Sequence, residues 1–165
     1  MNKKSARTLL VLSALVMALV ISPAAVSYPN GIQGVKDSGC NCHGAVTSSE
    51  VVPSITGLPD QYNYSETYEI TVSFVGGPSD PSNINQGGFN LWVSDGELSP
   101  SDATVQSYSV NEVSHTEAGN DQTSWTMTWT SPSSDRNVEF VLHTNSVNGN
   151  ADGANGGSSG DMWNR

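Results

Sequence analysis

The sequence predicts an all-β protein, an antiparallel β-sandwich with an irregular arm at its N-terminus. Apolar residues recur at every second position in several short segments, most clearly in Tyr68–Phe74, so one face of each segment meets a core and the other meets water. Gly, Pro, Asn and Ser separate these segments at short intervals. No helical apolar period longer than one turn appears after residue 27. About five to seven short strands joined by turns are typical of a sandwich.

Residues 1–27 are expected to be a signal peptide. A basic start is followed by the apolar run Leu9–Ile21, and Ala25-Val26-Ser27 places the expected cleavage before Tyr28. A run of 13 residues is shorter than the about 20 that a membrane-spanning helix needs. We therefore expect an extracytoplasmic protein, secreted or at the cell surface, with no membrane span in the mature chain.

The mature chain is strongly acidic. Removing residues 1–27 leaves three basic residues (Lys36, Arg136 and Arg165) against 16 acidic ones, a net charge of −13. Such a surface repels phosphate backbones and anionic lipids, which excludes nucleic acid and membrane surfaces as partners.

The arm, residues 28–49, has no regular period, and residues 50–165 are expected to form one sandwich domain. Pro53 predicts an edge position for the first strand. In the strand that ends near Thr144, His143 lies opposite the apolar positions and is expected to be solvated, whereas Met127 is expected in the core. Strands are expected at Glu50–Thr56, Tyr68–Phe74, Gly87–Val93, Thr104–Val113, Thr123–Thr130 and Asn137–Thr144.

The stretch Asn148–Asp161 is rich in Asn and Gly and is expected to be a flexible loop. An alternative is a Ca²⁺ loop that uses Asp152 and Asp161, although the spacing of an EF-hand is missing. Trp163 is expected to open or join a final strand, and we expect a truncated C-terminus as readily as a complete one.

The chemistry of the chain is concentrated in the segment Ser38–Gly44, which holds both cysteines and one of the three histidines. Two thiols followed by an imidazole resemble the Cys-x-x-Cys-His motif of c-type haem attachment, here with one residue fewer between the cysteines. Haem c would be bound through Cys40 and Cys42, with His43 as the proximal iron ligand. The flanking glycines give the backbone the freedom that the shorter spacing requires.

Two other interpretations of this segment stay open. Cys40, Cys42 and His43 could hold copper or zinc, with His115 or a methionine completing the set of metal ligands. His115 is also the best second iron ligand, because it is expected in a polar loop. The two cysteines could also form a tight, redox-labile disulfide. Such a disulfide would close almost no loop and would add little stability.

Motifs of common enzyme classes are absent from the sequence. It has no Gly-x-Ser-x-Gly, no phosphate-binding loop and no His-Glu-x-x-His, so we expect a protein that is not an enzyme. Asn63-Tyr64-Ser65 matches the N-glycosylation pattern, which often arises by chance.

Two parts of the chain resemble known families. The Gly39–Gly44 segment resembles the N-terminal Cys-x-x-Cys-His-Gly segment of exported prokaryotic proteins of the choice-of-anchor V type. The remainder is similar to their Reelin-like (reeler) domain, in the segments Gly87–Phe89, Ser114–Thr116, Ser124–Pro132 and Asn145–Asp161. The resemblance implies a secreted or surface-anchored Reelin/immunoglobulin-like sandwich with covalently attached haem c. The chain departs from the pattern in the spacing of its cysteines and in having no C-terminal anchor.

The leading hypothesis is therefore an exported haem c-binding electron-transfer protein, whose partner is a redox protein. The alternative is an extracellular interaction or adhesion module that binds a surface ligand and whose arm holds a metal ion or a disulfide.

Overall fold

Short strands dominate the computed structural model of the chain, which describes residues 29–149 and 160–165. The expected signal peptide and most of the Asn- and Gly-rich stretch lie outside the described residues. The described residues contain two 3₁₀ helices, η1 (Asn41–His43) and η2 (Glu117–Gly119), and none of their helices is long and apolar enough to cross a membrane. The strands are β1 (Val52–Thr56), β2 (Thr67–Val75), β3 (Gly87–Val93), β4 (Glu97–Pro100), β5 (Val105–Ser109), β6 (Glu112–His115), β7 (Ser124–Thr130), β8 (Phe140–Ser146) and β9 (Met162–Asn164).

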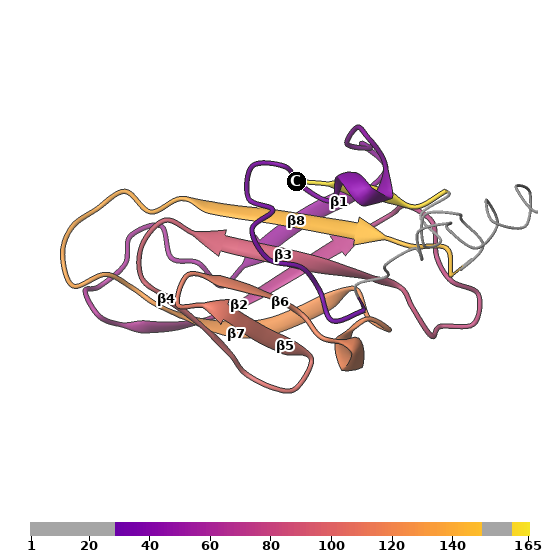
Figure 1. Cartoon of the computed structure of the whole chain (residues 1–165). Coiled ribbons are helices and arrows are strands. Elements are labelled where there is room, and N and C mark those ends of the chain that lie inside the picture. The colour runs from indigo at the N-terminus through magenta and orange to yellow at the C-terminus, as the bar shows by residue number, and fades with distance from the viewer. Residues whose placement is uncertain (1–28, 150–159) are drawn as a thin grey trace, which may run out of the picture.

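The strands form two antiparallel sheets that pack face to face (Figure 1). The first sheet has the order β1-β2-β7-β4, and the second has the order β5-β6-β3-β8-β9. The predicted all-β sandwich is confirmed. Pro53 lies in β1, which is an edge strand, as expected for a residue without a backbone N–H.

Side chains that alternate along the central strands fill the space between the sheets. Met127 is fully buried, as expected, and the ring of Trp125 packs on Phe89 with centroids 4.9 Å apart. Burying aromatic side chains of this size removes a large apolar area from water. The buried cluster consists of Val51, Ile70, Val72, Phe74, Phe89, Leu91, Val93, Leu98, Val105, Val113, Trp125, Met127, Trp129 and Leu142.

The expected strand limits were partly wrong. The single strand expected at Thr104–Val113 is a hairpin of β5 and β6, because a turn interrupts it after Ser109. The strand β4 was missed, since Leu98 is its only buried residue and no alternation is visible. The strand expected at Asn137–Thr144 begins later and extends further, as β8.

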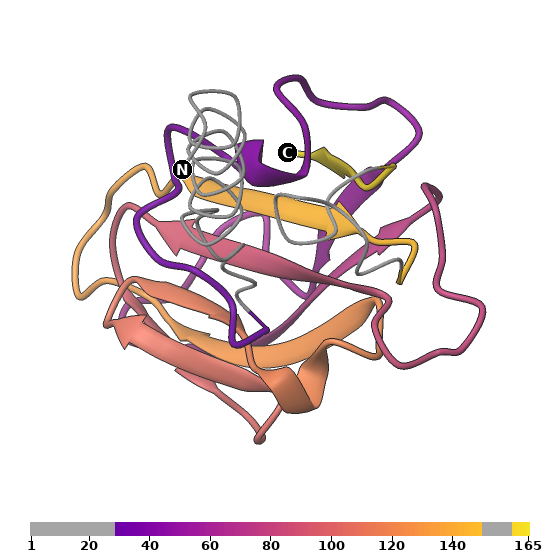
Figure 2. The same cartoon turned by 45° about the vertical axis from the view of Figure 1, so that its right-hand side comes forward.

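The N-terminal arm covers the outer face of the second sheet (Figure 2). Its backbone bonds to polar side chains of that face: the Asn90 amide donates to the Ile32 carbonyl at 2.8 Å, and His143 Nε2 lies 3.0 Å from the Lys36 carbonyl. The ammonium of Lys36 lies 5.0 Å from the centre of the Trp92 ring.

The expectation that His143 is solvated was therefore wrong, because this side chain is fully buried. Alternation along β8 does place His143 on the outer face of its sheet, but the arm fills the space where water was expected.

Candidate functional site

The cysteine-containing turn is held against the C-terminal strand. Gly39 adopts a φ of +68°, and a Cβ at this position would come within 2.4 Å of the Trp163 ring, so both the backbone angle and the contact require glycine. Trp163 is buried, and its indole N–H donates to the Gly44 carbonyl at 2.8 Å. The Ser48 N–H donates to the Trp163 carbonyl at 2.8 Å. The expectation that Trp163 joins a final strand is confirmed, and β9 pairs with β8.

His43, the expected iron or metal ligand, contacts a buried carboxylate. Its Nδ1 lies 2.9 Å from Oδ2 of Asp161, whose side chain is 3% exposed. Asp161 also accepts the Asn148 N–H at 3.1 Å. The other ring nitrogen of His43 lies 3.5 Å from the Asn145 amide nitrogen. The imidazole is thus oriented by groups from β8 and from the residues just before β9.

The two thiols have different surroundings. Both cysteines are free, Cys40 is partly buried and Cys42 is exposed. Burial, together with the smaller effect of the nearby Cys42, raises the pKa of the Cys40 thiol to about 12. Cys40 therefore has a smaller thiolate fraction at neutral pH than an ordinary cysteine.

His115 lies at the end of β6, packed against β3, and not in a polar loop as expected. Its Nδ1 accepts the Phe89 N–H at 3.1 Å, and its ring occupies the space that a Cβ on Gly88 would need. Burial lowers the pKa of His115, the Phe89 carbonyl oxygen 3.2 Å from Nδ1 opposes this because it would accept the proton of the charged ring, and the charge of His43 lowers the pKa further. The imidazole thus serves the packing between β6 and β3.

His143 carries a buried polar atom without a partner. Its Nδ1 has no hydrogen bond, and a Cβ on Gly39 would lie 3.2 Å from it. Burial lowers the pKa of His143, although the hydrogen bond to the Lys36 carbonyl opposes the shift. Sequence reasoning missed this contact, since nothing in the sequence indicates that the arm covers β8.

The expected ligands do not converge on one point. Within residues 29–149 and 160–165, no group of three His, Cys, Asp or Glu side chains is close enough to hold a metal ion. Cys40 is partly buried, and the Nε2 atom of His43 lies 3.5 Å from the Asn145 amide nitrogen. In this arrangement of the arm, the residues do not fit a bound haem or a copper or zinc ion.

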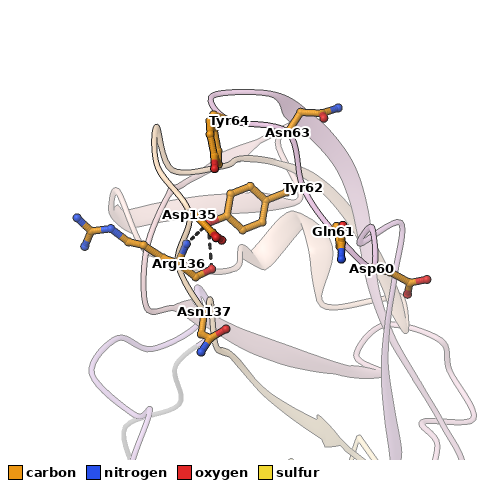
Figure 3. Close-up of a pocket in the computed structure, with 8 residues that line it drawn as sticks. All are labelled: Asp60, Gln61, Tyr62, Asn63, Tyr64, Asp135, Arg136 and Asn137. Atoms are coloured by element: carbon orange, nitrogen blue, oxygen red, sulfur yellow. Dashed lines mark hydrogen bonds between the residues drawn. The ribbon is translucent and has the colours of Figure 1, made fainter.

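A second region with functional side chains lies at one end of the sandwich, between the loop before β2 and the loop before β8 (Figure 3). The two loops enclose an open cleft of about 530 Å³. Sequence reasoning missed it, because its two halves are some 70 residues apart; the only signal was the polar turn at Asn63–Ser65, considered as a glycosylation site. The lining residues are Asp60, Gln61, Tyr62, Asn63, Tyr64, Asp135, Arg136 and Asn137.

The loops of this cleft are tied together by Tyr62. Its hydroxyl lies 3.0 Å from the carbonyl oxygens of Ser134 and Arg136, between which its single hydrogen is shared, and it accepts the Arg136 N–H at 2.9 Å. The Tyr62 ring packs edge-on against Trp129, with centroids 5.6 Å apart. The Ser131 hydroxyl adds a bond to the Asn63 carbonyl at 2.6 Å. The cleft is thus anchored to the hydrophobic core.

No family model matches the chain, and no curated protein matches it. Among solved structures it is similar to the human F-spondin reeler domain (fragment 1), with 21% identity and a TM-score of 0.42 over 59% of this chain and 76% of that one. It is also similar to the Reelin-N domain of F-spondin, with 21% identity and a TM-score of 0.44 over 59% and 73% of the two chains. A second human F-spondin reeler fragment has 18% identity and a TM-score of 0.42 over 58% and 78%. At these values the similarity adds no argument about function.

Proposed function

We propose that the protein is an exported interaction module that binds a surface ligand through the cleft between residues 60–64 and 135–137. The observation that supports the proposal is the tie between the two loops: the Tyr62 hydroxyl shares its hydrogen between two carbonyl oxygens and accepts one N–H, from residues 72 and 74 positions away. A cleft that is formed before binding loses little conformational freedom when a ligand enters.

The side chains around the Tyr62 hydroxyl are of types that commonly bind ligands. Tyr64 is 59% exposed, and its ring is oriented by an edge-on contact with Tyr62. Arg136 is also largely exposed, and its guanidinium lies 3.3 Å from the Asp95 carboxylate. Tyr and Arg are the residue types that contribute most often to binding hot spots, and loops at one end of a sandwich commonly present them.

Binding of the purified, labelled protein to the envelopes of the cells that export it tests the proposal. The double variant Tyr64→Ala/Arg136→Ala is expected to lose most of the retention. The control Ile84→Ser changes an exposed residue of the loop after β2, at the other end of the sandwich, and is expected to bind as the wild type does. Equal retention of all three proteins, each with an unchanged melting temperature, would overturn the proposal.

A second candidate function is the haem c-binding electron-transfer protein with a redox partner, or its copper- or zinc-binding counterpart. One observation favours it: the contact between His43 Nδ1 and the buried Asp161 is how a carboxylate commonly orients a metal-ligating imidazole. The arm would first have to release Cys40 from its partly buried position and His43 Nε2 from Asn145.

The two candidates differ in the mass and colour of the mature protein. Expression in a host that matures c-type haem would give red protein with a covalent mass increase and a Soret band that survives acid-acetone extraction, if the second candidate holds. Colourless protein of unmodified mass, without bound metal, would exclude the second candidate and leave the interaction module as the proposed function.

A further inference from the structure

We infer that the cleft binds a neutral, polyhydroxylated ligand, an oligosaccharide, with the ring of Tyr64 as its stacking platform. This inference rests on the proposed function and names the class of ligand for the same site. Figure 3 shows the Tyr62 and Tyr64 rings beside one another, with Asp135 of the opposite loop next to Tyr62 and the Arg136 side chain extending away from both rings.

The free hydrogen-bonding groups of the cleft match hydroxyl groups. Within the described part of the chain, four polar side chains of the cleft have no hydrogen bond or ion pair to protein: Asp60, Gln61, Asp135 and Asn137. The carboxylates only accept, whereas the amides both donate and accept. A hydroxyl group also donates and accepts, so a sugar with several hydroxyls satisfies both kinds of group. An apolar ligand would leave them unpaired at a free-energy cost.

The electrostatics of the cleft argue against an anionic ligand. Asp60 and Asp135 oppose a single cation, Arg136, which is already paired with Asp95 at 3.3 Å. The chain after residue 27 carries a net charge of −13, so an anion also meets long-range repulsion. The same net charge attracts a cationic ligand over long range, but exposed ion pairs in water contribute little to affinity, and a cation would leave the donors of Gln61 and Asn137 unused.

Tyr64 supplies the apolar part of the contact. The C–H face of a sugar ring is apolar and packs on an aromatic ring, which buries area from both partners. Tyr64 is more than half exposed, so a ligand has free access to its ring. The centroid distance of 6.3 Å to Tyr62 and the angle of 62° between the rings mean that Tyr62 supports the platform and does not cover it face-on.

Calorimetric titration of the full mature protein with three neutral hexasaccharides tests the inference: cellohexaose, chitohexaose and maltohexaose. At least one is expected to bind, and Tyr64→Ala is expected to weaken it by about tenfold or more, because the stacking platform is lost. Tyr64→Phe keeps the ring and is expected to stay within about threefold of the wild type, which separates stacking from the hydroxyl. Ile84→Ser is the control with unchanged affinity.

Salt and charged probes complete the test. Affinity for the neutral hexasaccharide is expected to be the same at low and at high salt, because no ion pair forms. The inference is overturned if no neutral hexasaccharide binds, if binding is insensitive to Tyr64→Ala, or if only oligolysine or oligogalacturonate binds. Retention on cell envelopes that depends on the cleft, without any saccharide binding, would overturn the ligand class and keep the interaction module. Retention that is independent of the cleft would overturn both.

Discussion

The packing of the arm against β9 predicts that its two thiols differ in their rates of alkylation. Cys40 and Cys42 belong to one short turn, yet only Cys42 is exposed. We predict that an alkylating reagent such as iodoacetamide modifies Cys42 of the reduced, folded protein first and Cys40 much later. In urea, where the arm is released, both are expected to react at similar rates.

The size of the effect follows from the pKa of Cys40. A rise from 9.0 to about 12 lowers the thiolate fraction at pH 8 by about a thousandfold, and only the thiolate reacts. A more basic thiolate is a stronger nucleophile, with a Brønsted coefficient of about 0.4–0.5, which compensates for about 1.2–1.5 of the three decades. Alkylation of Cys40 in the folded protein should therefore be slower than in urea by about 30- to 60-fold or more.

Timed quenching and peptide mass spectrometry measure the two rates separately. Trp163→Ala removes the ring that packs on Gly39 and the indole bond to Gly44, so it is expected to raise the Cys40 rate toward its value in urea. Tyr64→Ala removes an exposed aromatic residue of the cleft and is the matched control, with an unchanged Cys40 rate.

Three outcomes would contradict this view of the arm. Equal rates for Cys40 and Cys42 in the folded wild type would show that the turn is not docked. A Cys40 rate that Trp163→Ala leaves unchanged would show that β9 does not hold the turn. Two cysteines that fail to react even in urea with a reductant would indicate thioether bonds and favour the second candidate function.

Two further predictions concern stability. Burial lowers the pKa of His143 in the folded state, so as the pH falls below the unfolded-state value of 6.5 the unfolded chain binds the proton first. The contribution of His143 to the free energy of unfolding is therefore complete above about pH 6.5 and falls with decreasing pH by up to about 1.4 kcal/mol per pH unit. A urea-unfolding midpoint that stays constant between pH 8 and pH 5 would refute this. Gly39→Ala and Gly34→Ala both place a Cβ at a φ near +70°, which costs about 1–2 kcal/mol of stability each. Only the Cβ of Gly39→Ala also meets the Trp163 ring, so we expect this variant to be the more destabilising by a further ~1–3 kcal/mol. Equal melting temperatures of the two variants would contradict the packing of Gly39 on Trp163.

Alternation in the sequence predicted the central strands of both sheets. In rows of apolar residues such as Phe89, Leu91 and Val93, the alternation identifies the side that faces the core, although the arm also buries the opposite side, where Asn90 lies. Prediction failed where packing and not pattern decides the element: β4 has one buried residue, and the turn at Val110 divides one expected strand into two. Neither feature leaves a periodic signal.

The candidate sites were harder to predict than the strands. The sequence identified Cys40, Cys42 and His43 as residues with chemistry, but not that Asp161 and Trp163 would hold them from the far end of the chain. The cleft depends on contacts between loops that are distant in sequence, which no local pattern reveals. In both sites, hydrogen bonds of single side chains to segments distant in sequence hold the residues in place.

The way the arm is bound explains why its sequence looks irregular. Asn90 and His143, on adjacent strands, contact the carbonyls of Ile32 and Lys36, so at these two positions the sheet supplies the side chains and the arm supplies its backbone. A backbone acceptor is present at every residue, and the arm therefore needs no apolar period to find its place. The sheet has no such freedom, because a residue without a donor at either position would leave a covered carbonyl unpaired.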